Sequence, residues 1–172
     1  MMVEPVKLFA GIIFRHDAPI DRVKGMLAEK FSDIDYESQV IDFVFTDYYH
    51  KEMGKPLKRM FVSFKELIMP EELSQIKKLT IEIEKEFSEN GNRTVNIDPG
   101  YLECAKVILA STKNFYHRIY LSDGIYAEVT LHWQDDDYRT FNWTFPDYKT
   151  EAYYNILKEI RGIYIIQRKN AK

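Results

Sequence analysis

The chain has 172 residues, of which 45% are hydrophobic and 30% are charged, as in an ordinary folded domain. Its 24 basic residues are outnumbered by 27 acidic ones, giving a net charge of −3. This balance argues against a nucleic-acid or membrane-surface partner, because both favour a basic footprint. One cysteine, Cys104, excludes an internal disulfide framework and a cysteine-only zinc site.

No targeting segment is expected. The longest apolar run near the start, Leu8–Phe14, is seven residues long and is too short for a spanning helix or a signal peptide. We therefore expect a single cytoplasmic domain over residues 1–172. Seven widely spaced glycines exclude both the dinucleotide fingerprint and the phosphate loop, which need closely spaced glycines.

The first half of the chain alternates between strand and helix patterns. Apolar periodicity and turn residues predict, in order, a strand at Leu8–Phe14, a helix from Pro19 to about Phe31, strands at Val40–Tyr49 and Lys58–Lys65, a helix from Pro70 to about Asn90, and a short strand at Arg93–Ile97. The order β-α-β-β-α-β is that of the ferredoxin-like unit. Residues 1–97 therefore predict a ferredoxin-like core and an α+β fold.

The second half, residues 98–172, predicts an extension packed on that core. Asp98 followed by Pro99 favours the start of a helix that runs to about Ala110, although a strand at Val107–Ala110 fits nearly as well. A β-hairpin follows around Ser122-Asp123-Gly124. The last element is a helix from about Asp147 to Tyr164.

The register of the hairpin follows from the partition of its side chains. A three-residue loop pairs Leu121 with Ile125 and separates an apolar face from a polar one, whereas a two-residue loop mixes them. In the favoured register Arg118 lies opposite Glu128, and Tyr120 lies opposite Tyr126.

The polar face of the hairpin is a candidate ligand site. Arg118 can bind an anion, Glu128 and His132 can move protons, and Tyr120 and Tyr126 can stack on a ring. The alternative is a solvated sheet face with one cross-strand ion pair.

Two further segments carry candidate residues. In Asn-Ile-Asp-Pro-Gly-Tyr, Asn96 and Asp98 point the same way if the strand continues, and Tyr101 follows closely. Lys113 lies in a polar turn that could hold a phosphate. No pattern of His and Cys residues predicts a metal site, and no cofactor is predicted.

The chain also resembles a bacterial family of unknown function over nearly its whole length, most strongly at residues 94–148. The resemblance is carried by Asn-Ile-Asp-Pro-Gly-Tyr-Leu (96–102), Ala-Ser-Thr-Lys-Asn (110–114), His-Arg-Ile-Tyr-Leu (117–121), Gly-Ile-Tyr-Ala-Glu-Val-Thr-Leu (124–131) and Trp-Thr-Phe-Pro-Asp-Tyr (143–148). Some members are labelled "GTP-binding protein", but this chain has neither a phosphate loop nor an Asn-Lys-x-Asp motif. The resemblance implies no assigned activity and no assigned catalytic residues.

Two functional hypotheses follow from these features. The first is binding, with or without turnover, of a small anionic ligand such as a nucleotide or sugar phosphate. Its candidate catalytic residues are Glu128 and Asp98, with Glu128 as the base, and its candidate binding residues are Asn96, Tyr101, Lys113, Arg118, Tyr120, Tyr126 and His132. The second is a non-catalytic protein-interaction module that uses exposed aromatic residues, including self-association.

Overall fold

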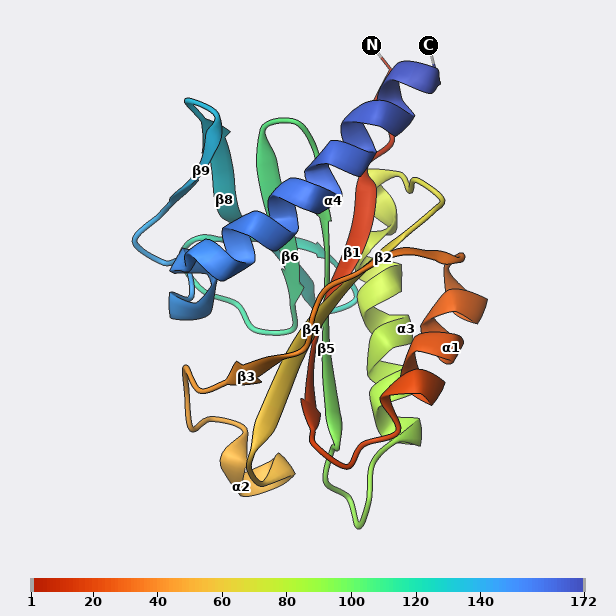
Figure 1. The fold of residues 1–172 in the computed structure, drawn as a ribbon, viewed down its shortest axis with the longest axis vertical. Helices are drawn as coiled ribbons and strands as arrows, with labels where there is room; N and C mark the ends of the chain where they lie inside the picture. Colours follow the sequence, from red (N-terminus) through yellow and green to blue (C-terminus); the bar gives the residue numbers. More distant parts are fainter. Residues whose placement is uncertain (1, 172) are drawn as a thin grey trace.

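The computed structural model describes residues 2–171, which form a nine-stranded antiparallel sheet with helices on both faces (Figure 1). The elements are, in chain order, β1 (Lys7–Arg15), α1 (Ile20–Lys30), β2 (Ile34–Glu37), β3 (Ile41–Phe43), α2 (His50–Met53), β4 (Leu57–Phe64), α3 (Leu73–Glu86), β5 (Val95–Leu102), β6 (Lys106–Ser111), β7 (Arg118–Ser122), β8 (Ile125–Gln134), β9 (Asp137–Thr140) and α4 (Glu151–Asn170). Between residues 2 and 171, no helix is both long and apolar enough to cross a membrane.

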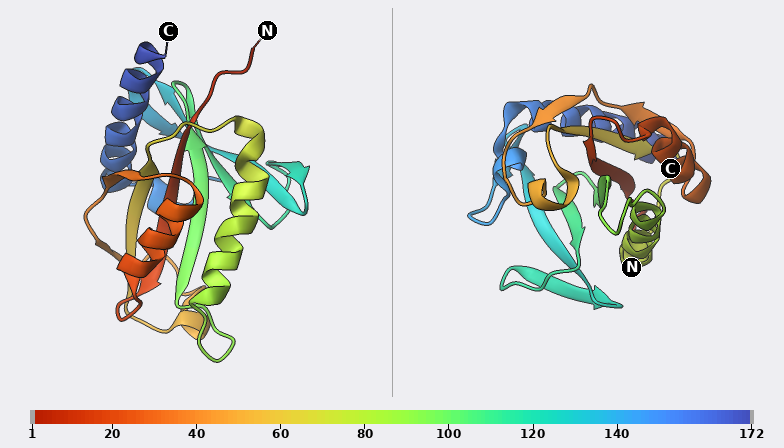
Figure 2. Two further views of the ribbon diagram at one scale, coloured as in Figure 1. Left: turned by 90° about the vertical axis from the view of Figure 1, so that its right-hand side faces the viewer. Right: turned by 90° about the horizontal axis from the view of Figure 1, so that it is seen from below.

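The strands lie in the order β2-β4-β1-β5-β6-β8-β7, with β3 paired to β4 and β9 paired to β8. Helices α1 and α3 cover one face of the sheet, and α4 crosses the other (Figure 2). The predicted α+β class is confirmed. One continuous sheet joins the two predicted parts of the chain, because their boundary at residues 97 and 98 lies inside β5.

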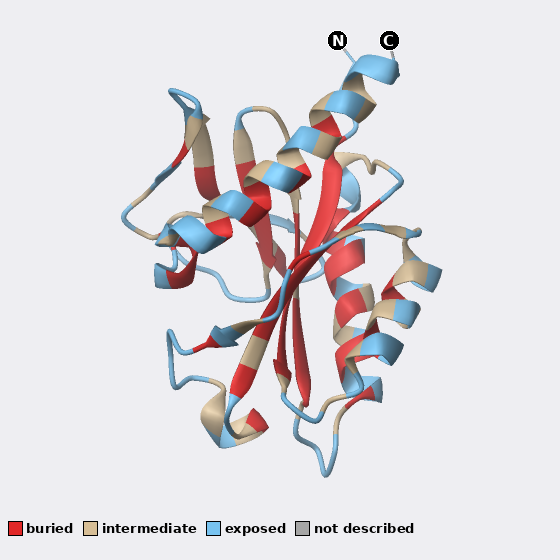
Figure 3. Ribbon diagram, in the orientation of Figure 1, coloured by how far each residue is buried: buried red, intermediate tan, exposed pale blue. Residues whose placement is uncertain are grey.

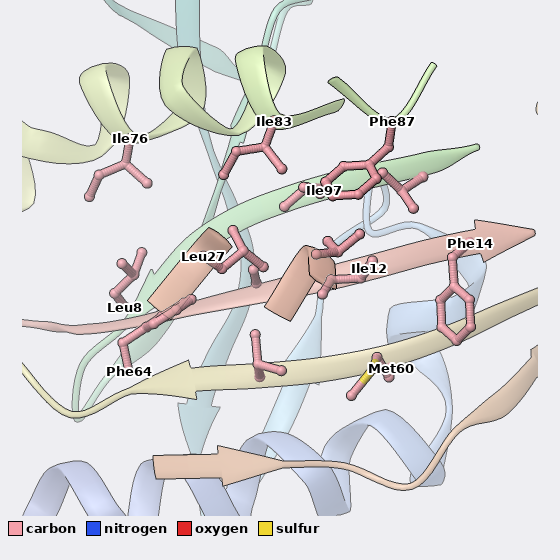
Figure 4. Packing of buried hydrophobic residues seen from close by; sticks show 14 residues of the cluster. Leu8, Ile12, Phe14, Leu27, Met60, Phe64, Ile76, Ile83, Phe87 and Ile97 are labelled. Carbon is pink, nitrogen blue, oxygen red and sulfur yellow. The ribbon is translucent and has the colours of Figure 1, made fainter. Parts of the chain in front are cut away.

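The central strand β1 is buried along nearly its whole length, as are its neighbours (Figure 3). Successive side chains of a strand point to opposite faces. Leu8, Ile12 and Phe14 therefore pack with α1 and α3, as Figure 4 shows, whereas Phe9 packs against Phe61 and α4. Each such buried side chain stabilises the fold by roughly 1.5–3 kcal/mol, so β1 holds both layers together.

The predicted strand at Val40–Tyr49 is wrong in its second half. Only Ile41–Phe43 pairs with β4, and the earlier strand β2 was not predicted. Val44 is 78% exposed and Phe45 is 37% exposed, so the alternating apolar pattern there does not face the core. The chain leaves the sheet and forms a loop that leads into α2.

The predicted helix from Asp98 to about Ala110 is also wrong, and the alternative strand at Val107–Ala110 is correct. β5 continues through Asp98 to Leu102, a turn follows, and β6 returns antiparallel to it. Asp98 therefore caps no helix. The last predicted helix begins later than expected, at Glu151, because Pro146–Lys149 forms a 3-10 turn and Thr150 caps α4.

The predicted pairing of the late hairpin is confirmed along most of its length and wrong at its tip. Arg118 lies opposite Glu128, and Tyr120 lies opposite Tyr126. Ser122, rather than Leu121, pairs with Ile125, because a bulge precedes a two-residue turn. The turn residues Asp123 and Gly124 have φ angles of 52° and 79°, the left-handed values that a tight hairpin turn requires.

Strands β5 and β6 pair for only three residues and then diverge. Their paired residues are Gly100, Tyr101 and Leu102 on β5, so residues 95–99 have no strand on that side within the described chain. Side chains of α3 replace the missing strand: the Ile97 N–H donates to Glu84 Oε1 (2.7 Å), and the Ile97 carbonyl accepts from Lys77 Nζ (2.9 Å). We call this divergence the strand fork.

Two residues of β5 suit the strand fork. Strand alternation directs the backbone nitrogen of Pro99 to the same side as that of Ile97, and proline has no N–H to leave unpaired there. At Gly100 the two strands approach so closely that an added Cβ would lie 2.3 Å from the carbonyl oxygen of Ile108. Only glycine fits this contact without displacement of a backbone.

This contact predicts opposite effects of two alanine substitutions. Gly100→Ala should lower the free energy of unfolding by about 3 kcal/mol or more, because backbone atoms must move. Gly162→Ala should raise it by about 0.5–1 kcal/mol, because Gly162 is exposed within α4 and an added Cβ meets nothing within 4 Å. Urea unfolding of the two variants measures both changes; equal effects would show that β5 and β6 can separate freely at Gly100.

Candidate functional site

A cavity of about 800 Å³ lies at the strand fork. β5 contributes Asn96 and Asp98, and β6 contributes Leu109, Ala110 and Ser111, so the two diverging strands form two of its walls. The loop before α2, one side of α3, the 3-10 turn before α4 and single residues of β1, β4, β7 and β8 also contribute to the lining. We call this space the fork cavity.

The fork cavity concentrates charge and aromatic rings. Its six basic residues are Arg59, Lys77, Lys85, Arg93, Lys113 and Arg118, and its four acidic residues are Glu84, Asp98, Glu128 and Asp147. Its six aromatic residues are Phe43, Phe45, Tyr48, Tyr49, Phe145 and Tyr148. The lining therefore carries a positive surplus, although the whole chain has a net charge of −3.

Arg59 is the central buried cation of the fork cavity. Its side chain is 3% exposed; Nη2 donates to Asp147 Oδ2 (3.0 Å) and Nε donates to Tyr153 Oη (2.9 Å). Burial disfavours its charge, but Tyr153, Tyr148, Asp147 and Asp98 outweigh burial and raise its pKa above the ordinary value. The guanidinium therefore stays charged inside the protein.

The contacts of Arg59 are incomplete. Its Nη1 is buried without a hydrogen-bond partner among the described residues, and Asp98 Oδ2 lies 3.5 Å from it. The buried hydroxyl of Tyr148 also lacks a partner there. Each unpaired buried polar group lowers the stability of the fold by about 1–3 kcal/mol. A polar ligand in the cavity could form hydrogen bonds with both groups.

A short chain of polar contacts joins Asp98 to α2. Asn96 donates from Nδ2 to Asp98 Oδ2 (2.9 Å) and accepts from Arg93 Nη1 (2.7 Å). Arg93 also donates from Nε and Nη2 to the two oxygens of Glu52, at 2.8 and 2.9 Å. This paired contact lowers the pKa of Glu52, so the chain of contacts holds the Asp98 carboxylate in place.

A second cluster joins the hairpin to the turn after β6. Arg118 Nε donates to Glu128 Oε2 (2.9 Å), and Arg118 Nη1 donates to Ser111 Oγ (3.2 Å) and to the Lys113 carbonyl (2.9 Å). Glu128 is 1% exposed and also contacts His117 Nε2 (2.7 Å) and the Thr130 hydroxyl (3.2 Å). Both oxygens of Glu128 are thus engaged, and this carboxylate fixes the position of Arg118.

The structure brings five of the nine candidate residues together. Asn96, Asp98, Lys113, Arg118 and Glu128 all line the fork cavity. Asn96 and Asp98 share one face because the strand continues through them, as the sequence suggested. Arg118 and Glu128 are buried partners rather than a solvated pair, with side-chain exposures of 10% and 2%.

The other four candidates do not line the fork cavity. Tyr101 is three residues beyond Asp98 on β5, so strand alternation turns it to the opposite face, where it packs with Leu73 and Ile108. Tyr120 and Tyr126 form an edge-to-face pair, with ring centroids 5.3 Å apart, near the tip of the hairpin.

His132 is displaced by an irregularity in β8. The register with β6 shifts so that Thr130 has no directly opposite residue, and the inward position passes from Thr130 to Leu131, both fully buried. His132 therefore leaves the face that carries Glu128 and packs on Phe141.

Sequence reasoning missed Arg59, Asp147 and the aromatic residues of the fork cavity. Arg59 carried one usable signal, because it is a charged residue on the strand face that also carries the apolar residues Leu57 and Phe61. The segment 43–49 offered no comparable signal, because its phenylalanine residues alternate with other residues as they would in a β-strand. No group of three or more His, Cys, Asp or Glu residues in the range 2–171 is arranged to hold a metal ion.

The fold and the fork cavity define an α+β protein with a charged, aromatic-lined cavity beside an interrupted strand pair. Residues 4–164 match the family model described as "Domain of unknown function (DUF4416)", and the chain belongs to that family. Comparison with curated proteins gave no match. Comparison with solved structures gave none either.

The burial of Glu84 beside the strand fork predicts a pH effect on stability. Burial raises the pKa of Glu84 above 4.5, and Lys77, the Ile97 N–H and Arg93 offset this only in part, while Asp98 adds to it. The folded state therefore holds this proton more tightly than the unfolded state. The contribution of protonated Glu84 to the free energy of unfolding is fully present below pH 4.5. It is lost as the pH rises through the pKa of Glu84 in the folded state.

Glu84→Gln should remove this loss while keeping an oxygen that can accept from the Ile97 N–H. The free energy of unfolding of Glu84→Gln, relative to the wild type, should rise with pH above about 4.5. Urea titrations at several pH values measure the difference, with Glu82→Gln on the exposed face of α3 as control. A difference that falls with pH would contradict the assignment.

Proposed function

We propose that the protein binds a small anionic ligand, such as a nucleotide or sugar phosphate, in the fork cavity. The main observation in support is that the residues lining this cavity include six basic and only four acidic side chains. Its volume of about 800 Å³ is typical of small-molecule sites. Aromatic residues supply apolar walls, and the unpaired Arg59 Nη1 and Tyr148 hydroxyl supply polar contacts for a guest.

Turnover of the ligand would place different demands on the two candidate carboxylates. Glu128 is committed to Arg118, His117 and Thr130. Asp98 Oδ1 has no hydrogen bond within the described chain, and Lys77 Nζ lies 3.8 Å from it. We therefore favour Asp98 for any proton transfer and assign Glu128 the role of positioning Arg118.

Ligand binding should appear as thermal stabilisation. A ligand at 100 times its Kd adds about 2.7 kcal/mol, which corresponds to a rise in Tm of roughly 5–10 °C for a chain of this length. We expect such a rise with phosphate-containing compounds for the wild type. Arg118→Gln should abolish the rise but keep a cooperative unfolding transition.

Lys78→Gln is the matched control for this measurement. Lys78 lies on α3 outside the fork cavity, pairs with Asp123 and is half exposed, so its loss should not change the response to ligands. No rise for the wild type with inorganic phosphate, sugar phosphates or nucleotides at millimolar concentration would refute the proposal.

A second candidate function is self-association through β7. The outer edge of β7 pairs with no other strand of residues 2–171. Ile119 is 71% exposed, Tyr120 57% and Leu121 38%, and Figure 2 shows the hairpin at the edge of the sheet. The one charge of the strand, Arg118, is held inward by Glu128. Antiparallel pairing about Tyr120 would place Ile119 against Leu121 of a second copy.

Sedimentation of the purified protein tests this candidate. The wild type should form dimers, and Ile119→Lys should shift it to monomers, because a charge would enter the apolar contact. Ile166→Lys on α4 should not, since Ile166 is similarly exposed but far along the chain from the hairpin. A monomeric wild type at high micromolar concentration would exclude self-association.

We also retain three finer interpretations as proposals. The strand order β2-β4-β1-β5 supports a ferredoxin-like core for residues 1–97. The single cysteine, Cys104, is free, which suits the reducing cytoplasm, and the motifs of the second half suit a bacterial origin.

A further inference from the structure

The fork cavity has two ends of different charge and exposure. At the buried end, Arg59, Lys77 and Arg93 face an equal number of carboxylates, those of Glu84, Asp98 and Asp147. At the exposed end lies the turn Ser111–Lys113, with Arg118 beneath it and the exposed rings of Tyr48 and Phe145 around it. Arg118 pairs with Glu128, and Lys85 pairs with Glu82 outside the lining, so among the described residues the uncompensated positive charge is that of Lys113 at the exposed end.

The buried end is unsuited to an anion. Arg59 already lies 3.0 Å from Asp147 and 3.5 Å from Asp98, so two carboxylates balance its single charge. An anionic group brought to its free Nη1 would also meet these two carboxylates in a water-poor environment, where like charges repel strongly. The free Nη1 is suited instead to a neutral acceptor.

The exposed end has an uncompensated cation. Lys113 Nζ contacts the Tyr48 hydroxyl (2.8 Å) and lies 4.3 Å from the centre of the Tyr48 ring, but it pairs with no carboxylate in the described part of the chain. Arg118 lies directly below the turn, bound to Ser111 Oγ and the Lys113 carbonyl. An anion at this turn would gain a partner for Lys113 at little desolvation cost.

The free polar atoms of the buried end match hydroxyl groups. Arg59 Nη1 can donate a hydrogen bond, Asp98 Oδ1 can accept one, and the Tyr148 hydroxyl can do either. A ligand group that pairs with all three must both donate and accept without carrying charge. The neighbouring rings of Phe43 and Tyr49 offer apolar surface to the carbon skeleton of such a ligand.

Building on the proposed function, we infer that the ligand is a phosphorylated sugar or polyol. Its phosphate lies at Ser111–Lys113 and Arg118, and its hydroxyl groups reach Arg59, Asp98 and Tyr148. The balance of charges at the two ends of the cavity decides which end holds the phosphate. The unpaired groups of Arg59, Tyr148 and Asp98 indicate that the rest of the ligand carries hydroxyl groups.

Calorimetric titration of the full chain with separate probes tests this inference. The probes are inorganic phosphate, a panel of ribose 5-phosphate, glucose 6-phosphate and glycerol 3-phosphate, and adenosine monophosphate. We expect at least one phosphorylated sugar or polyol to bind about tenfold or more tightly than inorganic phosphate, because it adds hydrogen bonds to charged groups. Free ribose should not bind measurably.

Two variants test the contributions of the two ends of the cavity separately. Lys113→Gln should weaken inorganic phosphate and the sugar phosphate by a similar factor, about tenfold. Asp98→Asn should reduce the affinity for the sugar phosphate towards that for inorganic phosphate and leave inorganic phosphate unchanged. Lys78→Gln should change neither.

The outcomes distinguish this inference from the proposed function. If phosphate binds but no member of the panel binds more tightly, or if adenosine monophosphate binds tenfold more tightly than every member, an anion site exists and the sugar inference is overturned. If Asp98→Asn changes the affinity for inorganic phosphate and Lys113→Gln does not, the orientation is overturned. If no probe binds to the wild type, the proposed function itself fails.

Discussion

The charged interior of this protein depends on Ile97 of β5, which pairs with β1 on one side and has no partner strand on the other among the described residues. Where β5 leaves β6, the N–H and carbonyl of Ile97 are buried, and leaving both unpaired would cost about 1–3 kcal/mol each. Glu84 and Lys77 satisfy them from α3. These two side chains bring opposite charges into the interior, and such charges need further partners.

The remaining ionic contacts extend outward from that pair. Glu84 meets Arg93, which binds Glu52 and Asn96; Lys77 approaches Asp98, which approaches Arg59. Gly11, opposite Asp98 on β1, leaves room for Arg59, since an added Cβ would lie 2.9 Å from its Nη1. The fork cavity is therefore a consequence of how a sheet accommodates an interrupted strand pair.

Local patterns in the sequence predicted the parts of this arrangement that depend on period and turn chemistry. The strand Leu8–Phe14 follows from a continuous apolar run, and alternation gives the hairpin pairing of Arg118 with Glu128 and the common face of Asn96 and Asp98. The helix at 98–110 failed because Asp-Pro resembles a helix start, and only the partner strand β6 shows that β5 continues. Arg59 is 88 residues from Asp147, so no local pattern relates them.

The two candidate functions share a strand. Arg118 and Ile119 are adjacent on β7, and their side chains point to opposite faces, one lining the fork cavity and the other exposed. Pairing along the free edge of β7 would reduce the mobility of the strand that carries Arg118. Self-association and ligand binding would then support each other through the rigidity of β7 rather than through any shared contact.

The way the sheet ends also limits how large an assembly it can form. β2, at the far end, has only four residues and an irregular register with β4, and the open side of β5 is occupied by side chains of α3. Among the described strands that pair on one side only, β7 is the longest, with five residues, whereas β2 and β9 have four and β3 has three. Because the other free edges are so short, pairing through β7 favours a closed symmetric dimer over strand-by-strand growth into a filament.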